Sequence, residues 1–238
     1  MSRPLILIID DESKIRRLVA ANLELEGFDV VSGGDGQQGL EIFQRAAEKP
    51  DLILLDLMMP EMDGMTFLRK LRAFSNTPVI ILSAKDERPT VIEGFRIGAD
   101  DFIAKPFYLQ ELLERIRAVL RRCTRSTVPY THADSQTLKS GKIHLQPSKR
   151  QCFVGETAVK LTDTEFRLLQ ELVRHEGEVL THERLLRRVW GDEYTGEVQY
   201  LRVTFARIRR KLEAAGLDGG IISSYSSVGY ILCSSEAD

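Results

Sequence analysis

Short apolar runs alternate with amphipathic segments over the first half of the chain. Three of the runs consist almost entirely of Ile, Leu and Val, as is typical of strands that helices cover on both faces. The segments between them repeat apolar residues at helical spacing. This alternation predicts an α/β domain over residues 1–122, with a doubly wound, five-stranded parallel sheet. The predicted strands are 5–10, 28–32, 52–56, 79–83 and 102–104, and the predicted helices are 14–26, 36–48, 65–74, 89–97 and 108–122.

The pattern changes after residue 122. Residues 123–137 are mostly polar and contain Pro129, which predicts a linker. Short alternating runs follow, then three helical stretches, and finally two apolar runs around a Gly/Ser turn. Residues 138–235 are therefore expected to form a second, α+β domain that ends in a hairpin. Its predicted strands are 142–145, 151–154, 158–161, 221–224 and 230–233, and its predicted helices are 164–175, 182–190 with Thr181 as the cap, and 197–214.

Composition narrows the class of protein. A length of 238 residues suits two ordinary domains, and no apolar run approaches the ~20 residues that cross a bilayer. The apolar run at residues 5–9 is too short for a signal peptide, so a cytoplasmic location without membrane contact is expected. The cysteines and histidines show no metal-ligand spacing. The net charge is −2, yet residues 199–211 hold five basic residues and no acid, so positive charge is concentrated on one predicted helix.

Polar residues follow the ends of four predicted strands of the first domain. These residues are Asp10, Asp11, Asp56, Ser83 and Lys105. Each one alone is typical of a helix cap or a turn. Ligands of an open parallel sheet gather beyond the carboxyl ends of its strands, however, and this whole set is expected at that edge. Its joint occurrence favours a common site over five unrelated caps.

The chemistry of this set indicates a metal-dependent phosphate site. Clustered carboxylates repel one another, and a hard divalent cation such as Mg²⁺ relieves the repulsion through oxygen ligands. With the metal bound, one carboxylate can attack a phosphoryl group in line and form an acyl phosphate. The ammonium of Lys105 can pair with a phosphoryl oxygen, and the hydroxyl of Ser83 can donate a hydrogen bond to another.

Residues 1–122 resemble the receiver domain of two-component response regulators over their full length. The motifs that carry the resemblance are IIDDE (8–12), LILLDLMMPEMDGM (52–65), VIILSA (79–84) and GADDFIAKPF (98–107). The resemblance implies a flavodoxin/CheY-like fold and a switch that takes phosphate from the phosphohistidine of a sensor histidine kinase. The implied roles are Asp56 as phosphoacceptor, Asp10 and Asp11 as the acidic metal-binding pair, the backbone carbonyl of Met58 as a further metal ligand, Ser83 and Lys105 as phosphate-sensing residues, and Phe102 as the switch aromatic. For Phe102, plain core packing is the alternative.

The segment 100–112, together with Arg115, resembles the OmpR/PhoB subfamily. Members dimerise through the fourth helix, fifth strand and fifth helix of the receiver. The resemblance therefore implies a homodimer on activation, with Asp100 and Asp101 facing basic residues such as Arg115 and Arg122 across the interface. A solvated charged loop is the alternative for these residues.

One position departs from the subfamily pattern. Where members usually carry Lys or Arg in the fourth helix, this chain has Val91. Glu111 is then expected to lack its usual partner across the interface, which alters the charge pattern of that surface. We expect the interface to be kept and to be more apolar at this point.

The stretch 199–212 combines the residue types that duplex DNA requires. Phosphates need Lys and Arg, and base edges need forked or amide donors such as Arg and Gln. Apolar residues at helical spacing are expected to hold this helix to the core, and three arginines lie on its more open sides. These are Leu201, Phe205, Ile208 and Leu212 on the core side, and Arg202, Arg209 and Arg210 on the open sides. Taken alone, the stretch is more typical of an ordinary charged surface helix.

Residues 138–233 resemble the winged-helix effector domain of the OmpR/PhoB subfamily, on segments 161–191, 199–212 and 227–232. The resemblance implies a transcription regulator that binds direct repeats in double-stranded promoter DNA. It makes 199–211 the recognition helix, with Thr204 and Arg207 pointing toward bases, and 191–197 a loop for RNA polymerase. The residues expected to contact DNA are Gln199, Tyr200, Arg202, Thr204, Arg207, Arg209, Arg210, Lys211 and Ser226.

The predicted hairpin also departs from the subfamily pattern. Many members carry Arg-Gly shortly before the final Gly-Tyr, and that Arg enters the minor groove. This chain has Ser226 and Ser227 there, so a weaker wing contact is expected, made through hydroxyls. The two serines and the sequence QYLRV favour the KdpE-like branch. Trp190 is expected to be a core anchor.

Two other classes of protein fit the sequence less well. An aspartyl phosphatase of the haloacid dehalogenase type carries a second Asp two residues after its nucleophile, and here that position is Met58. The chain is therefore expected to be a phosphoacceptor switch and not an enzyme with a separate substrate. A regulator that acts only through protein contacts is the third class, and the basic helix argues against it.

Overall fold

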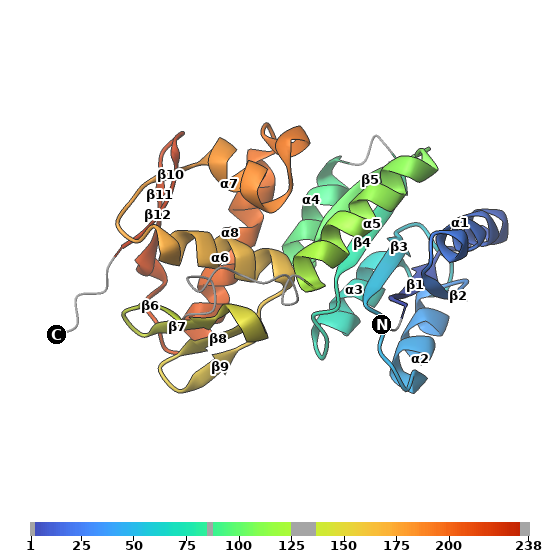
Figure 1. The fold of residues 1–238 in the computed structure, drawn as a ribbon, viewed down its shortest axis with the longest axis horizontal. Helices are drawn as coiled ribbons and strands as arrows, with labels where there is room; N and C mark the ends of the chain where they lie inside the picture. The colour runs from blue at the N-terminus through green and yellow to red at the C-terminus, as the bar shows by residue number, and fades with distance from the viewer. Residues whose placement is uncertain (1–2, 85–87, 125–136, 234–238) are drawn as a thin grey trace. The chain divides into compact units, whose positions relative to one another are not determined.

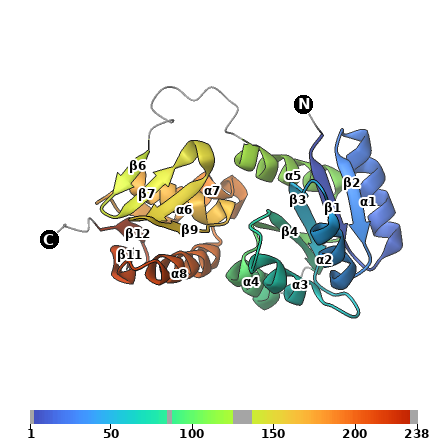
Figure 2. The ribbon, with the colours of Figure 1, turned by 90° about the horizontal axis from the view of Figure 1, so that it is seen from below.

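The computed structural model describes residues 3–84, 88–124 and 137–233. The chain divides into two compact units, Met1–Cys123 and Thr124–Asp238, and each is described by itself (Figure 1, Figure 2). Most of the predicted linker, residues 125–136, lies outside the described residues. Among the described helices, none is long and apolar enough to cross a membrane.

A parallel sheet of five strands, in the order β2-β1-β3-β4-β5, forms the centre of the first unit. The chain adds strands to one side of β1 and then to the other, so the predicted doubly wound α/β fold is confirmed. The predicted strands were placed to within two residues. The strands are β1 Leu5–Ile9, β2 Asp29–Gly33, β3 Leu52–Asp56, β4 Val79–Ala84 and β5 Asp101–Lys105.

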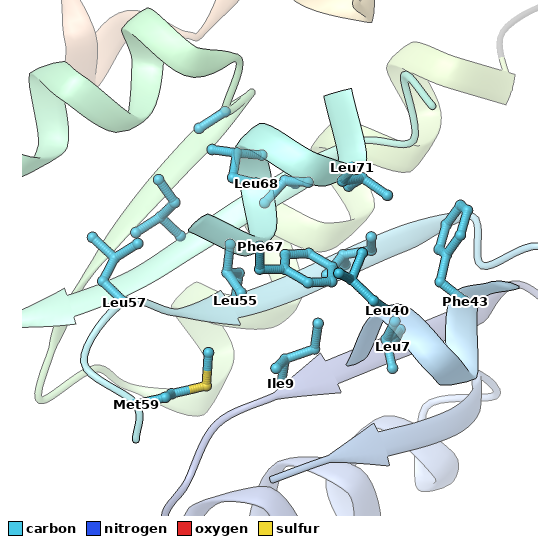
Figure 3. Packing of buried hydrophobic residues seen from close by; sticks show 14 of the residues in the cluster. Leu7, Ile9, Leu40, Phe43, Leu55, Leu57, Met59, Phe67, Leu68 and Leu71 are labelled. Atoms are coloured by element: carbon cyan, nitrogen blue, oxygen red, sulfur yellow. The ribbon is translucent and has the colours of Figure 1, made fainter. Parts of the chain in front are cut away.

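Helices cover both faces of this sheet, because alternate residues of each buried strand point to opposite sides. Leu7 and Ile9 of β1 pack with residues of α2 and α3, whereas Ile6 and Ile8 pack with residues of α1 and α5. Figure 3 shows the first of these layers, where Phe67 of α3 lies among apolar side chains of the strands and of α2. The helices are α1 Ser13–Leu25, α2 Gly36–Arg45, α3 Gly64–Arg72, α4 Arg88–Ile97 and α5 Leu109–Thr124.

The second unit is the predicted α+β winged-helix fold. It begins with an antiparallel sheet of four strands in the order β6-β7-β8-β9, continues with three helices, and ends in a sheet of three strands in the order β10-β12-β11. The strands are β6 Leu138–Ser140, β7 Ile143–Gln146, β8 Gln151–Val154, β9 Thr157–Val159, β10 Leu180–Thr181, β11 Ile222–Tyr225 and β12 Gly229–Leu232. The helices are α6 Asp163–Arg174, α7 His182–Val189 and α8 Val198–Ala214, with short 3₁₀ turns at Pro147–Lys149, Asp192–Tyr194 and Gly219–Ile221.

Side chains cap the first two of these helices. Thr162 and Glu165 form a reciprocal capping box at the start of α6. The predicted cap of α7 is confirmed, since the hydroxyl of Thr181 accepts a hydrogen bond from the backbone N–H of Arg184. The first residues of both helices therefore have fixed positions, and α7 begins directly after the two residues of β10.

Candidate functional site

Three carboxylates meet at the carboxyl ends of β1 and β3. One oxygen from each of Asp10, Asp11 and Asp56 lies within 4.8 Å of the others. The register brings them together, because β1 and β3 are parallel neighbours with Ile9 beside Leu55. The side chains of Asp10 and Asp56 are buried, and that of Asp11 is exposed. The structure thus places three of the five predicted pocket residues in one cluster.

Lys105 brings a positive charge to this cluster from the end of β5. Its Nζ lies 2.8 Å from Asp10 Oδ2 and 3.2 Å from Asp56 Oδ2. Ser83 is buried one strand away, at the end of β4, where it pairs with Ala104. The pocket therefore combines three carboxylates with one ammonium, so two net negative charges remain to be balanced when all four groups are ionised.

A glycine permits the tight turn after Asp56. A Cβ atom at Gly64, the first residue of α3, would lie 2.1 Å from the backbone oxygen of Asp56, so only glycine fits there. The backbone N–H of Leu57 also donates to Asp56 Oδ1 at 2.9 Å. The hydrogen bond from Leu57 holds Oδ1 of Asp56, while Oδ2 lies 3.2 Å from Nζ of Lys105.

Burial raises the pKa of Asp56. Lys105 opposes this effect, and the nearby charge of Asp10 adds to it, so the net direction of the pKa is upward. Burial lowers the pKa of Lys105, but its hydrogen bond to Asp10 and its attraction to Asp56 and Asp10 outweigh burial and raise that pKa. The two directions agree with the distances, because Lys105 lies closer to Asp10 than to Asp56 and neutralises Asp56 incompletely.

This donor set fits a hard divalent cation. Mg²⁺ prefers carboxylate oxygens, and three of them converge here with an excess of negative charge. Met58, the predicted backbone ligand, follows β3 by two residues, and its side chain is exposed. The role of the Met58 backbone carbonyl as a metal ligand stays a prediction.

Arg16 belongs to this site and was missed from the sequence. Its guanidinium Nη1 donates to the backbone oxygen of Asp10, which ties α1 to the end of β1. A Cβ atom at Gly34 would also lie 3.5 Å from Arg16 Nη1. The signal was available, since an Arg six residues after Asp10 and on the following helix can reach back to the strand end.

The predicted DNA-reading helix, α8, has exposed and buried sides. Gln199, Arg202 and Arg210 are exposed, as predicted for residues that contact DNA. Arg209 is half-buried, because its Nε donates to the backbone oxygen of Ile222 and its guanidinium lies 5.8 Å from the ring centroid of Tyr230. The open side of α8 is therefore narrower than the sequence predicted.

The structure corrects the prediction that Arg207 points toward bases. Its Nη2 lies 2.6 Å from Oε1 of the buried Glu165, and its side chain is 7% exposed. Lys211 joins the same carboxylate, with its Nζ 2.7 Å from Glu165 Oε2. Both cations are drawn inward by the acid of the capping box of α6, so they tie α8 to α6.

The structure also corrects the predicted DNA contacts of Thr204 and Tyr200. Thr204 is buried, and no described residue makes a hydrogen bond to its hydroxyl. Tyr200 is buried with its ring centroid 6.4 Å from that of Trp190, which confirms Trp190 as a core residue. The apolar side of α8 is wider than its four predicted core residues, which explains both errors.

Comparisons with known proteins agree with both units. Residues 6–117 match the family model described as "Response regulator receiver domain", and residues 155–232 match "Transcriptional regulatory protein, C terminal". The chain is 38% identical to the "DNA-binding dual master transcriptional regulator RpaA" of Synechocystis over 232 residues, which cover 96% of this chain and 95% of that protein. It is 36% identical to the "Response regulator MprA" of Mycobacterium bovis over 228 residues, covering 95% and 96%. The chain belongs to the OmpR/PhoB family of response regulators.

A solved structure shows the same two-unit organisation. The response regulator is similar to a mutant of RitR, with a TM-score of 0.73 and 26% identity over 96% of this chain and 98% of that one. The coarse function follows from the two family models, so this protein is a transcriptional response regulator with a receiver and a DNA-binding domain. The predicted assignment to a KdpE-like branch stays a prediction.

The structure places Asp100 inside the receiver, although the sequence predicted it at the dimer surface. It is 1% exposed, its Oδ2 lies 3.3 Å from Nη2 of Arg72, and it accepts a hydrogen bond from the backbone N–H of Val79. Arg72 also donates to the backbone oxygens of Gly98 and Thr77. Asp100 is thus buried within this receiver, where it holds two loops together.

The other predicted interface residues pair within the chain. Arg115 lies 3.6 Å from Asp101 and 3.0 Å from Glu111 within the same chain, and the lack of a partner for Glu111 across the interface stays a prediction. Val91 is buried, which corrects the expectation of added apolar surface there. Arg122 lies in α5, and its side chain falls outside the described residues.

Phe102, the predicted switch aromatic, is partly exposed in β5. It packs against the hydrophobic layer between the sheet and the helices α2 and α3. It lies two residues before Ala104, which pairs with Ser83, so the two predicted switch residues sit on adjacent strands near the same sheet edge. Their switch roles stay predictions.

Proposed function

We propose that Asp56 accepts a phosphoryl group from the phosphohistidine of a partner sensor kinase, in the presence of Mg²⁺, and that this modification drives receiver dimerisation and binding to direct repeats in promoter DNA. The observation that carries the proposal is the cluster of Asp10, Asp11 and Asp56 with Lys105 at its edge. The match to receiver domains supports it.

Phosphoryl transfer would use Asp56 as the nucleophile. A carboxylate oxygen forms a bond to phosphorus while the bond from phosphorus to the histidine nitrogen breaks, and the pair of electrons leaves with the imidazole. Asp10, Asp11 and Asp56 would hold Mg²⁺, which neutralises charge on the transferring group. Burial keeps the Asp56 carboxylate away from bulk water, so fewer water molecules have to leave it before it attacks.

Lys105 and Ser83 would sense the product. Lys105 already lies 3.2 Å from Asp56 Oδ2, so it can pair with a phosphoryl oxygen after a small movement. Ser83 would donate a hydrogen bond to another oxygen, and Phe102 would follow it inward. The chemistry is confined to self-phosphorylation and dephosphorylation, so we class the protein as a switch and not as an enzyme.

Dimerisation would use α4, β5 and α5, as in the family. Asp101, Glu111 and Arg115 lie in β5 and α5 and pair with one another within the chain. A second receiver would exchange these pairs for equivalent ones between subunits, which sets register more than affinity. Two copies on one DNA would then occupy direct half-sites about one helical turn apart.

DNA binding would rely on the exposed side of α8. Arg202 and Arg210 can contact phosphates, and Gln199 can donate to a base edge. Residues 191–197, around the short turn at Asp192–Tyr194, would contact RNA polymerase in the bound state.

Light scattering with and without beryllofluoride tests the proposal. In Mg²⁺, the wild-type molar mass should double when beryllofluoride is added, and Asp56→Asn should stay monomeric. Asp29→Asn is the matched control, because Asp29 is an exposed carboxylate on β2 outside the cluster. A doubling of mass in Asp56→Asn would reject Asp56 as the acceptor, and no doubling in the wild type would reject phosphorylation-driven dimerisation.

A further inference from the structure

Asp11 is the exposed member of the acidic cluster, yet the backbone on both sides of it is held. Asp10 and Asp56 are buried, whereas the side chain of Asp11 is exposed. The carbonyl oxygen of Asp10, which belongs to the peptide group before Asp11, accepts a hydrogen bond from Nη1 of Arg16. The backbone N–H of Glu12, which belongs to the peptide group after Asp11, donates to Oδ1 of Asp10 at 2.8 Å. Both peptide groups that flank Asp11 therefore have a hydrogen-bond partner that fixes them.

The contact between Arg16 and Asp10 determines where the backbone of Asp11 lies. The N–H of Asp10 donates to the oxygen of Gly33 at 3.3 Å, so Asp10 is held to the end of the sheet. The main freedom left is rotation about its Cα–C bond. A peptide group is planar, so a hydrogen bond that holds its oxygen also fixes that rotation and, with it, Cα of Asp11. Arg16, six residues further on in α1, supplies this hydrogen bond.

The guanidinium of Arg16 is itself confined by the segment between β2 and α2. A Cβ atom at Gly34 would lie 3.5 Å from Nη1 and 3.7 Å from Nη2 of Arg16, so this glycine lies beside the guanidinium. The N–H of Gly34 donates to Oε1 of Gln38 at 3.0 Å, and the N–H of Gln38 donates to Oδ1 of Asp35 at 2.8 Å. Arg16 is half-buried against this ordered segment. Its contact with Asp10 therefore joins three parts of the receiver: β1, α1 and the segment before α2.

Arg16 has two opposite effects on a cation site. Its positive charge repels a divalent cation, but a charge near the protein surface is screened by water and salt. Its hydrogen bond to the backbone orders Asp11 before any cation arrives. Ordering the backbone of one residue typically costs a factor of about ten or more in affinity, so the ordering effect should be the larger of the two.

We propose that Arg16 is a positioning residue for the metal site, because its hold on the carbonyl oxygen of Asp10 keeps the exposed Asp11 carboxylate within reach of a bound cation. This inference rests on the proposed Mg²⁺-dependent function and adds a residue that does not itself touch the cation. Arg16 differs in this respect from Lys105, which pairs with the carboxylates of Asp10 and Asp56. Because Arg16 uses a backbone oxygen, the carboxylate oxygens stay free to serve as ligands.

Binding of Mn²⁺ to the full-length protein tests the inference. Mn²⁺ prefers the same oxygen ligands as Mg²⁺, and electron paramagnetic resonance of the free ion gives its dissociation constant. Arg16→Met and Arg16→Gln remove the hydrogen bond and the charge, whereas Arg16→Lys keeps the charge and a donor. Arg17→Met is the matched control, since Arg17 is the next residue of α1 and is exposed. Thermal unfolding by circular dichroism checks that each variant is folded.

Loss of the hydrogen bond should weaken metal binding even though a cation has been removed. Arg16→Met and Arg16→Gln should each raise the dissociation constant of Mn²⁺ about tenfold. Arg16→Lys should stay within about threefold of the wild type, since its ammonium can donate to the same oxygen. Arg17→Met should bind Mn²⁺ as the wild type does or slightly more tightly, since it loses only a cation.

The rate of Asp56 phosphorylation separates metal binding from the chemical step. With phosphoramidate as donor, Arg16→Met should be slower than the wild type at limiting Mg²⁺ and should reach the wild-type rate at saturating Mg²⁺. A rate that stays low at saturating Mg²⁺ would contradict a role in positioning alone, because Arg16 would then act in phosphoryl transfer itself.

The remaining outcomes separate the inference from the proposed function. Unchanged or tighter Mn²⁺ binding in Arg16→Met would overturn the inference, since the charge would then outweigh the ordering of Asp11. Equal weakening in Arg17→Met would overturn it as well, because the effect would not be specific to the hydrogen bond. Asp11→Asn, which changes a proposed ligand, should weaken Mn²⁺ binding strongly. If it does not, or if the wild type fails to bind, the cluster is not the metal site and the proposed function fails together with the inference.

Discussion

Nη2 of Arg207, in the middle of α8, lies 2.6 Å from Oε1 of Glu165, in the first turn of α6. Glu165 is fully buried, so this ion pair joins two helices of the second unit across the core. An arginine that the sequence places among the DNA contacts is instead a structural tie. The predictions for this unit therefore separate residues that stabilise α8 from residues that face DNA.

Replacing Glu165 should destabilise the second unit. Glu165→Gln leaves Arg207 and Lys211 with an uncharged partner in a buried site, which typically costs about 3–5 kcal/mol. Urea unfolding of the full-length protein at neutral pH measures the loss. Glu176→Gln, an exposed acid just after α6, is the control and should change stability by less than about 0.5 kcal/mol. Equal midpoints for the two variants would contradict the tie.

The stabilisation by Glu165 should depend on pH. Burial raises the pKa of Glu165, but the charges of Arg207 and Lys211 outweigh burial and hold the pKa below its ordinary value of 4.5. A lowered pKa in the folded state means that the contribution is complete above pH 4.5 and is lost as pH falls through the folded value. The difference in unfolding free energy between wild type and Glu165→Gln should therefore shrink below pH 4.5. A difference that grows on acidification would show that the sign is wrong.

Arg202 and Arg207 should give different DNA-binding phenotypes. Arg202 is exposed, so Arg202→Ala should weaken DNA binding and reduce the salt slope by about one unit while leaving stability unchanged. Arg207→Ala should lower stability first, because it leaves Glu165 with one cation fewer. Anisotropy titrations and urea unfolding on the same samples separate the two effects. A stable Arg207→Ala that loses sequence preference would restore the role predicted from the sequence.

Removal of Arg72 should destabilise the receiver. Arg72→Met leaves the buried Asp100 without this cation and removes hydrogen bonds to the loops before β4 and β5, so a loss of about 3–5 kcal/mol is expected. Arg69→Met, on the same helix with a half-exposed side chain, should cost less than about 1 kcal/mol. The receiver transition in urea unfolding gives both values. Similar losses for the two variants would mean that the Asp100 pair contributes little.

The titration of the Asp56 carboxyl should depend on Lys105. Burial raises the pKa of Asp56 and Lys105 lowers it, so in metal-free protein Lys105→Met should shift the limb of this titration curve to higher pH. Carbon-13 NMR of the Asp56 carboxyl in the presence of a chelator, assigned with Asp56→Asn, measures the curve.

Lys14→Met is the control for that experiment. Lys14 is an exposed lysine on α1, so its removal should leave the position of the limb unchanged. A shift of the limb to lower pH in Lys105→Met would contradict the assigned role of Lys105.

The sequence predicted the acidic pocket better than the dimer surface and the DNA-contacting side of α8. Asp10, Asp56 and Lys105 lie at the carboxyl ends of strands, and these ends share one edge of a parallel sheet, so the predicted sheet already placed the three residues at that edge. Arg72 and Asp100 are 28 residues apart and belong to no local pattern. Their contact depends on how two loops approach in three dimensions, which spacing does not reveal.

The remaining differences between prediction and structure concern a very short strand, β10, and the width of the buried side of α8. β10 has only Leu180 and Thr181 and runs directly into α7, so no alternation of apolar residues marks it. On α8, helical spacing identified Leu201 and Phe205 as core residues, but the width of the buried side depends on partners such as Glu165. A single amphipathic pattern gives the direction of a face and not its extent.

β12 is shared between the wing and the start of α7. Because it pairs with β10 at Leu180 and with β11 at Ile222, a displacement of α7 would pull the hairpin along, and a force on the hairpin would be transmitted to α7. A Cβ atom at Gly229 would lie 1.8 Å from the backbone oxygen of Leu180, so this joint requires glycine and has no slack. Any rearrangement of the second unit on DNA should therefore move β10, the hairpin and the start of α7 together.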